Sequence, residues 1–352
     1  MADADLYDYD LPAELIAQEP LADRPAARLL VVGRAGGILR HRHVRDLPDL
    51  LRPGDLLVVN DTRVVPARLF GRRHPTGGKW EGLFLRIAAE GDHPGAWVLM
   101  ARSRGRPAIG ERILLDGRAA AAGVAIRLVG RGAGGTWLAV PESAEPYATL
   151  LGRVGRVPLP GYIRGGAERP GDLERYQTVF AREAGSAAAP TAGLHFDGPL
   201  LESLARRGIR RATVTLHVGL DTFRPISAER LDDHPMHTEW CECPAATVTA
   251  VEETRAGGGR VVAVGTTAVR TLESAARAGR LAAWSGPTDL FIRPGFQFRV
   301  VDGLLTNFHM PRTTLMVLVS TFASRGLIAA AYEEAIRERY RFLSYGDAML
   351  IE

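Results

Sequence analysis

The chain has 352 residues, of which 46% are hydrophobic and 24% charged; this composition is typical of a globular protein of about two domains and excludes an intrinsically disordered chain. The net charge is only +4, and the two cysteines, Cys241 and Cys243, are too few for a disulfide framework or a zinc site of four thiolates. The first ten residues are acidic, unlike a signal peptide, and the most apolar run, 314–323, is too short to cross a bilayer, so we expect a cytoplasmic protein.

The first 66 residues predict the beginning of an α/β domain. A short helix is expected over 13–17, directly after Pro12, and strands are expected over 27–32 and 55–61. Both strands are almost continuously apolar, which is typical of a sheet that is covered on both faces.

From residue 67 to residue 151 the pattern changes to short strands without helical periodicity. The apolar runs are separated by glycine-rich turns such as 131–134, which favours a small antiparallel barrel or sandwich. We therefore predict an inserted antiparallel β-barrel domain over 67–151. The expected strands lie at 81–87, 96–101, 111–115, 124–129 and 135–140.

After residue 152 strands and helices alternate again, which predicts a layered, Rossmann-like sheet. Residues 1–66 and 152–352 are thus expected to form one discontinuous α/β catalytic domain around the insertion. The expected helices are 199–207, 245–255, 267–277, 313–324 and 327–340, and the expected strands are 211–219, 260–264, 289–292 and 298–301.

Polar side chains follow several of these strands where they end. Gly265, Thr266 and Thr267 join a buried strand to a helix, which offers an anion site at the helix N-terminus, although Thr266 could also serve only as a helix cap. Asn60 and Asp61 end the strand 55–61 in the same way, and either form a turn or contact a ligand.

Five of the nine histidines lie between residues 195 and 309, in polar loops at expected strand or helix ends. This placement favours one shared cleft over independent core histidines. His41 and His43 have the spacing of a metal-ligand pair but lie far along the chain from the others, and Pro235 disfavours a helix that would pair His234 with His237, so we expect no metal site.

Arginine accounts for 43 of the 44 basic residues, and Lys79 is the one lysine. Arginine matches phosphate groups well, so the excess suits a nucleic-acid partner, but a GC-rich genome produces the same excess. Lys79 stands in the segment GGKWE (77–81), where either a compact ammonium is needed or one lysine has remained by chance.

Several segments, taken together in this order, resemble the S-adenosylmethionine:tRNA ribosyltransferase-isomerase family of queuosine biosynthesis. The similarity extends over essentially the whole chain, although Trp80, Gly82, Gly161 and the segment 240–243 (WCEC) differ from the family's usual residues. The matching stretches include 54–71 (GDLLVVNDTRVVPARLFG), 157–163 (VPLPGYI), 188–197 (AAPTAGLHFD), 215–223 (TLHVGLDTF), 264–275 (VGTTAVRTLESA) and 341–349 (RFLSYGDAM).

The resemblance implies an enzyme that consumes S-adenosylmethionine as a co-substrate and holds no permanent cofactor. The family moves the ribosyl part of S-adenosylmethionine onto 7-aminomethyl-7-deazaguanine at the tRNA wobble position and rearranges it, giving epoxyqueuosine while adenine and methionine leave. Its fold is a discontinuous α/β domain interrupted by a β-barrel, which agrees with the change at residue 67. The expected partners are tRNA and S-adenosylmethionine, with no membrane, no obligate protein partner and a monomeric state.

The implied reaction needs a general base at the ribose 5′ carbon and a general acid for the departing adenine. Histidine suits both proton transfers near pH 7, with base and acid left unassigned. The catalytic candidates are His195, His217, His237 and His309, with Asp221 or Glu239 to orient one of them.

The remaining candidates would bind the two substrates, since a helix N-terminus and a guanidinium both favour an anion such as the methionine carboxylate. For S-adenosylmethionine they are Gly265, Thr266, Thr267, Arg270, Asn60, Asp61, Arg63, Thr191 and Gly193. For the substrate base or the tRNA they are Lys79, Glu81, Tyr162 and Arg164.

The alternatives are an RNA-binding protein without catalysis, ribosyl transfer to a related modified base, a metal-dependent hydrolase, and an ordinary methyltransferase. The first expected strand lacks the glycine-rich loop after it that an ordinary methyltransferase would need, which disfavours this alternative.

Overall fold

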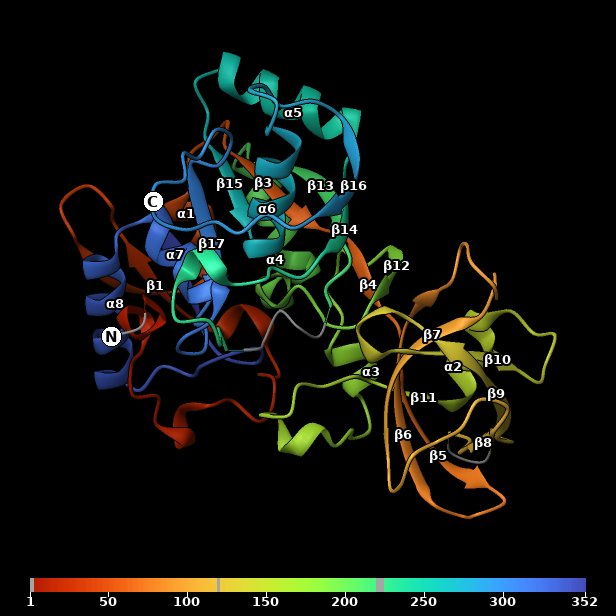
Figure 1. The fold of residues 1–352 in the computed structure, drawn as a ribbon. Coiled ribbons are helices and arrows are strands. Elements are labelled where there is room, and N and C mark those ends of the chain that lie inside the picture. The colour runs from red at the N-terminus through yellow and green to blue at the C-terminus, as the bar shows by residue number, and fades with distance from the viewer. Residues whose placement is uncertain (1–2, 119–120, 220–224) are drawn as a thin grey trace.

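The computed structural model describes residues 3–118, 121–219 and 225–352 and arranges them as a layered α/β domain and a β-barrel (Figure 1). The chain begins in the α/β layers, leaves them to form the barrel, and returns to them for its second half. This confirms the predicted discontinuous α/β domain with an inserted barrel. The boundaries at residues 66/67 and 151/152 remain a prediction.

Within the described residues the α/β domain contains a nine-stranded mixed sheet of order β16-β14-β13-β3-β15-β17-β18-β1-β2. The central strands β13, β3, β15 and β17 are mutually parallel, whereas β14, β16 and β2 run antiparallel to their neighbours. The strands are β1 (Arg28–Val32), β2 (Leu39–His43), β3 (Leu56–Asn60), β13 (Arg210–Leu216), β14 (Glu239–Cys243), β15 (Val261–Val264), β16 (Trp284–Thr288), β17 (Gly303–Asn307) and β18 (Ala348–Ile351).

Helices cover both faces of this sheet, which is why its central strands are apolar throughout. Val58 of β3 belongs to a core cluster with α5, α6, α7 and α8, while its neighbour Val59 belongs to a second cluster with α4. Alternate side chains of one strand therefore enter opposite layers. The helices are α1 (Leu47–Leu50), α4 (Gly198–Arg206), α5 (Ala245–Ala256), α6 (Thr266–Ala275), α7 (Thr314–Phe322) and α8 (Arg325–Arg337).

The strands of the barrel follow the order β5-β6-β7-β10-β9-β8. The barrel is closed because β8 pairs in turn with β5. Its interior is filled by fully buried side chains such as Trp97, Leu99 and Ile126, so it is a packed core. The strands are β5 (Arg68–His74), β6 (Lys79–Ile87), β7 (Trp97–Ser103), β8 (Arg112–Leu115), β9 (Val124–Arg131) and β10 (Trp137–Pro141).

Short elements join the barrel to the α/β layers. The helix α2 (Tyr147–Val154) packs Leu150 and Leu151 into the barrel core, and β11 (Gly155–Arg156) pairs with β5. The strands β4 (Thr62–Val64) and β12 (Glu183–Ser186) pair with each other, and α3 (Asp172–Arg175) lies between β11 and β12 in the chain.

Two expected strands were wrong. Residues 289–292 and 298–301 form no strand; the strands of this region are β16 and β17 on either side of them. The backbone N–H groups of Arg299, Val300 and Val301 donate to the Glu273 carboxylate at 2.9–3.1 Å instead of to a neighbouring strand. Burial of Ile292 and Val301 explains why the segments are apolar.

The expected first helix is also shorter than predicted. It is a single 3-10 turn, Ala13–Leu15, because Ile16 becomes extended and forms a bridge with Phe342. The sequence did not predict nine strands, namely β2, β4, β5, β11, β12, β14, β16, β17 and β18.

Both cysteines are free and buried on one face of β14. Across the described residues no single helix is long and apolar enough to cross a membrane; α7 and α8 together meet the length and composition and are bent by 112° at their junction.

Candidate active site

The parallel strands bring separate polar segments to one edge of the sheet. The strands β13, β3, β15 and β17 are adjacent and parallel, so their carboxyl ends meet there. The residues at or directly after these ends are His217, Asn60, Gly265 and Asn307.

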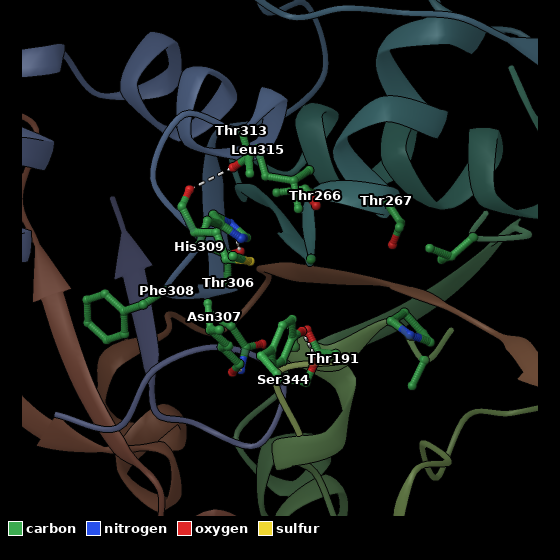
Figure 2. A pocket seen from close by; sticks show the side chains of 18 residues that line it. Thr191, Thr266, Thr267, Thr306, Asn307, Phe308, His309, Thr313, Leu315 and Ser344 are labelled. Carbon is green, nitrogen blue, oxygen red and sulfur yellow. Dashed lines mark hydrogen bonds between the residues drawn. The ribbon is translucent and has the colours of Figure 1, made fainter. Parts of the chain in front are cut away.

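A small cavity that opens to solvent lies at this edge. Figure 2 shows Thr266 and Thr267 of α6 on one side and the segment after β17, with Asn307 and His309, on another. The side chains of Thr191, Ser344 and Tyr162 complete the polar part of the wall, and the opposite part includes Thr313 and Leu315 at the start of α7.

The N-terminus of α6 forms one wall of the cavity. Gly265 turns the chain from β15 into the helix with φ +93°, a conformation that favours glycine. The hydroxyl of Thr267 is buried and has no hydrogen-bond partner among the described residues. The first N–H groups of a helix also lack intrahelical acceptors, so this wall offers donors to an anion or a polar ligand.

His309 is the candidate histidine that lines this cavity. Its backbone N–H donates to the Tyr332 hydroxyl at 2.8 Å, its carbonyl accepts from Tyr9, and the neighbouring Phe308 points away into the core (Figure 2). Nε2 is 3.0 Å from the Thr306 hydroxyl. Burial lowers the pKa of His309 to about 3, so its imidazole is neutral near pH 7.

His195 lies behind the cavity wall and lines a smaller pocket together with Arg24 and Tyr345. Its Nε2 is 3.3 Å from the Nδ2 atom of Asn307, which itself lines the cavity. Burial, with a further contribution from the nearby arginines, lowers the pKa of His195 to about 4. His195 therefore reaches the cavity through Asn307 and is neutral near pH 7.

These two buried histidines predict that acid destabilises the fold between pH 6.5 and pH 4.5. An unfolded histidine has a pKa of about 6.5, so across this window the unfolded state binds more protons and stability falls as the pH falls. With folded values of about 4 for His195 and about 3 for His309, the pair lowers the free energy of unfolding by roughly 4 kcal/mol over the window.

Thermal unfolding of the wild type and of the separate variants His195→Gln and His309→Gln, followed from pH 8 to pH 4.5, measures this effect. Below pH 6.5, stability should depend less steeply on pH in each variant than in the wild type, because about half of the contribution of the two histidines is lost. Above pH 7 the variants and the wild type should show the same dependence of stability on pH. Equal slopes below pH 6.5 would show that neither histidine is held neutral.

Tyr162 lines both the cavity and a wide cleft between the barrel and the α/β domain. Its hydroxyl is 2.7 Å from the Ser344 hydroxyl, and burial raises the pKa of Tyr162 to about 12. Arg164, two residues later, is ion-paired with Asp172 at 2.5 Å and Glu19 at 2.9 Å, and so anchors this loop.

Glu81 lies in the same cleft on the barrel side, paired with Arg68 at 2.7 Å and Arg102 at 2.6 Å. Lys79 is exposed and lines a separate hollow on the barrel, which shares Glu81 and Arg102 with the cleft. Both predicted residues of the GGKWE segment thus lie on one continuous surface.

The other two candidate histidines line a second hollow between the barrel and the sheet. His217 is held by Thr62, whose hydroxyl is 2.8 Å from Nδ1, and burial lowers the pKa of His217. His237 Nε2 is 3.5 Å from the Glu239 carboxylate. The prediction of one shared cleft for the histidines is therefore wrong: His309, His195 and this pair line three separate hollows.

Glu239 and Arg270 form a buried ion pair that ties β14 to α6. Burial alone would raise the pKa of Glu239, but Arg270, His237 and the Gly219 N–H hold it at about 2. Arg270 also donates from Nε to the Leu290 carbonyl at 3.2 Å. Its guanidinium is thus directed toward β14, and the cavity wall is formed by the preceding turn of α6.

The other predicted residues support the site from behind or lie beside it. The Asn60 amide joins β3 to β13 through Leu216, Asp61 is paired with Arg182 at 2.8 Å, and Arg63 donates to the Ala181 carbonyl at 3.1 Å. Gly193 is buried against Thr178 in the same loop as Thr191. Asp221 lies outside the described residues.

Thr306, Asn307, Thr313 and Ser344 line the cavity but were not among the predicted site residues. For Asn307 the signal was present, because it ends the apolar strand β17 as Asn60 ends β3. Ser344 carries no comparable local pattern. In the described part of the chain no group of three or more His, Cys, Asp or Glu side chains is placed to hold a metal ion.

Comparison with known proteins identifies the family. A family model described as "Queuosine biosynthesis protein" matches residues 4–351. A relative from Geobacter sulfurreducens, named S-adenosylmethionine:tRNA ribosyltransferase-isomerase, is 52% identical over 348 residues and covers 98% of both chains. One of the same name from Gloeobacter violaceus is 51% identical over 348 residues, which make up 99% of this chain and 95% of that one.

A solved structure agrees with these relatives. The crystal structure of an S-adenosylmethionine tRNA ribosyltransferase from Thermotoga maritima is 36% identical, covers 99% of this chain and 100% of its own, and superposes with a TM-score of 0.56. The chain therefore belongs to the S-adenosylmethionine:tRNA ribosyltransferase-isomerase family of queuosine biosynthesis.

Proposed function

We propose that this protein transfers the ribosyl part of S-adenosylmethionine to 7-aminomethyl-7-deazaguanine at the tRNA wobble position and isomerises it. The product is epoxyqueuosine-tRNA, and adenine and methionine are released, so S-adenosylmethionine is consumed. The observation that carries this proposal is a cavity at the carboxyl-end edge of the parallel strands, which has threonine, asparagine and histidine side chains in its wall and shares Tyr162 with the cleft toward the barrel. The protein acts in the cytoplasm, as a monomer.

S-adenosylmethionine occupies the cavity with its methionine carboxylate at the N-terminus of α6. The unpartnered Thr267 hydroxyl, the N–H groups of the first turn and the helix dipole all favour an anion there. Arg270 contributes indirectly, because its ion pair with Glu239 holds α6 against β14. Thr266 and Thr191 contact the co-substrate from the two sides of this wall.

His309 is the group we assign to the proton at the ribose 5′ carbon. The sulfonium of the co-substrate acidifies this carbon, and the His309 imidazole, which lines the cavity and is oriented by Thr306, is placed to accept the proton. His195 is a positioning residue that orients the Asn307 amide at 3.3 Å. The departing adenine needs a proton in turn, and His237, which lies in the adjoining hollow 3.5 Å from the Glu239 carboxylate, supplies it.

Tyr162 lies where the cavity meets the cleft and positions the modified base for attack by its neutral amine. Its hydrogen bond to Ser344 fixes the ring on this path. Glu81 and its two arginines line the barrel side of the same cleft, where the polynucleotide approaches.

The test is to incubate the purified protein with S-adenosylmethionine and tRNA that carries the aminomethyl base, then to analyse digested nucleosides by mass spectrometry. A cyclopentane adduct together with free adenine is the expected result. Binding of tRNA without free adenine would indicate an RNA-binding protein without catalysis. Adenine release with an adduct on another modified base would indicate a different acceptor.

A further inference from the structure

The hollow that contains His217 and His237 has aromatic walls that the proposed chemistry does not explain. It lies between the barrel and the sheet, with an empty volume of about 1400 Å³. The strands β6 and β7 and the first residue of α2 form its barrel side, and the end of β13 with β14 forms its other side. We call it the aromatic hollow, after Phe84, Tyr147, His217 and Trp240.

Two of these rings are much more exposed than aromatic residues in this chain generally are. Trp240 is 42% exposed, whereas Trp80, Trp97 and Trp137 are at most 3% exposed. Trp240 stacks on the His217 ring with centroids 5.3 Å apart and planes inclined by 20°. Tyr147 is 39% exposed on the opposite side of the hollow, stacked on Phe84 with centroids 5.8 Å apart and an angle of 18°.

The position of Trp240 in β14 directs it into the hollow. Side chains of a strand alternate between its faces, and in β14 Glu239, Cys241 and Cys243 are buried while Trp240 is exposed. An exposed tryptophan contributes little to the core. Stacking on His217 also fixes the orientation of the indole, so little side-chain entropy remains to be lost when a ligand covers it.

The charges around the rings suit a nucleotide. Arg86 lines the hollow and is exposed; its Nη1 donates to the Ile87 carbonyl at 3.4 Å, and no carboxylate of the described residues lies within ion-pair distance of it. The negative charge of Glu239 is compensated by Arg270, and burial lowers the pKa of His217 and so disfavours its charged form. The hollow thus combines stacked apolar ring faces with one available guanidinium.

We propose that the aromatic hollow receives an unpaired base of the tRNA next to the reacting base and holds it by stacking on Trp240 and Tyr147. Single-stranded RNA is recognised by aromatic faces for its bases and by arginine for its phosphates. The hollow adjoins the active site, since it shares Val218 with the cavity and Met100 with the cleft. The inference rests on the proposed tRNA substrate.

The experiment measures the affinity of the full-length protein for a labelled anticodon stem–loop RNA by fluorescence anisotropy, without S-adenosylmethionine. Trp240→Ala should raise Kd by about 5- to 150-fold, the effect of one lost stack, with an unchanged dependence on salt. Trp240→Phe should restore most of the affinity. Arg86→Ala should instead lower the slope of log Kd against log salt by about one.

Two comparisons make the result specific. Ile109→Ala removes a 64% exposed apolar residue of the barrel outside the hollow and should bind as the wild type does. A set of stem–loops with one abasic nucleotide each should contain one member for which Trp240→Ala no longer changes Kd. That member identifies the stacked nucleotide.

Wild-type affinity of both Trp240→Ala and Tyr147→Ala would overturn the inference. If Trp240→Ala does not fold, Tyr147→Ala decides alone, because it lies on a different element. Failure of the proposed reaction can be distinguished from failure of this inference. If only the proposed reaction is wrong, the wild type releases no adenine, while Trp240→Ala still raises Kd.

Discussion

Replacing His309 with alanine is expected to slow adenine release by about 10²- to 10⁴-fold, the usual contribution of a positioned proton-transfer group. Of the four candidate histidines, His309 is the one on the wall of the cavity we assign to S-adenosylmethionine. Its backbone is fixed by Tyr332 and its ring by Thr306, so the imidazole is already oriented. Affinity for tRNA should be largely unchanged, because His309 lines the cavity rather than the cleft.

The matched control is His41→Ala, which removes an exposed histidine from the edge strand β2. This variant should keep wild-type turnover. His309→Gln separates packing from proton transfer, because it fills the space and keeps a polar contact but is not a base. Turnover near the wild-type value in both His309→Ala and His309→Gln, with normal melting curves, would remove His309 from the reaction.

Single-turnover measurements of adenine release sharpen the outcome. An effect on the chemical step lowers the rate at saturating S-adenosylmethionine, whereas a lost binding contact is overcome by raising its concentration. His195→Ala should show a smaller decrease, since it acts through the Asn307 amide.

The strand ends could be predicted from the sequence, and the reason is topological. The apolar runs of β3 and β15 end in polar residues, and parallel neighbours in a covered sheet place such ends at one edge. The positions of Gly265, Thr266 and Thr267 on the cavity wall therefore follow from the strand pattern alone. Asn307 follows the same rule at the end of β17.

Other parts of the site depend on contacts between distant segments, which no local pattern encodes. Tyr162 and Ser344 are 182 residues apart in the chain, yet their hydroxyls are 2.7 Å apart in the folded protein. The histidines were expected in one cleft, but loop paths divide them among three hollows. An arginine such as Arg270 is suited to bind the anionic group of a substrate, but its guanidinium forms an ion pair with Glu239 of this chain instead.

The same limit explains the incorrect strands. Apolar residues at 289–292 and 298–301 indicated burial correctly, but burial does not determine the hydrogen-bond partner. Glu273, on α6, supplies the acceptors that a neighbouring strand would otherwise provide. A charged side chain that satisfies three backbone N–H groups is visible only once the helix is placed.

Replacing Glu239 with alanine is expected to lower the free energy of unfolding by about 3–5 kcal/mol, because it leaves the Arg270 charge buried without its partner. Both side chains are only 2% exposed, and the second guanidinium nitrogen of Arg270 has no other partner among the described residues. The Gly219 N–H, which donates to Glu239 at 2.9 Å, also loses its acceptor. Chemical denaturation measures the difference, with Glu202→Ala, which removes an exposed carboxylate from a surface ion pair, as the control.

The double variant Glu239→Leu/Arg270→Leu distinguishes a positioning role from a chemical one. Replacing both members of a buried pair by apolar residues is often neutral for stability, so the double variant should recover most of the loss. If the pair serves only to hold α6 against β14, adenine release should recover together with the fold, because Thr266 and Thr267 regain their place. A stable double variant without turnover would instead show that the pair itself contributes to the reaction, and His237, at 3.5 Å from the Glu239 carboxylate, would be the group it orients.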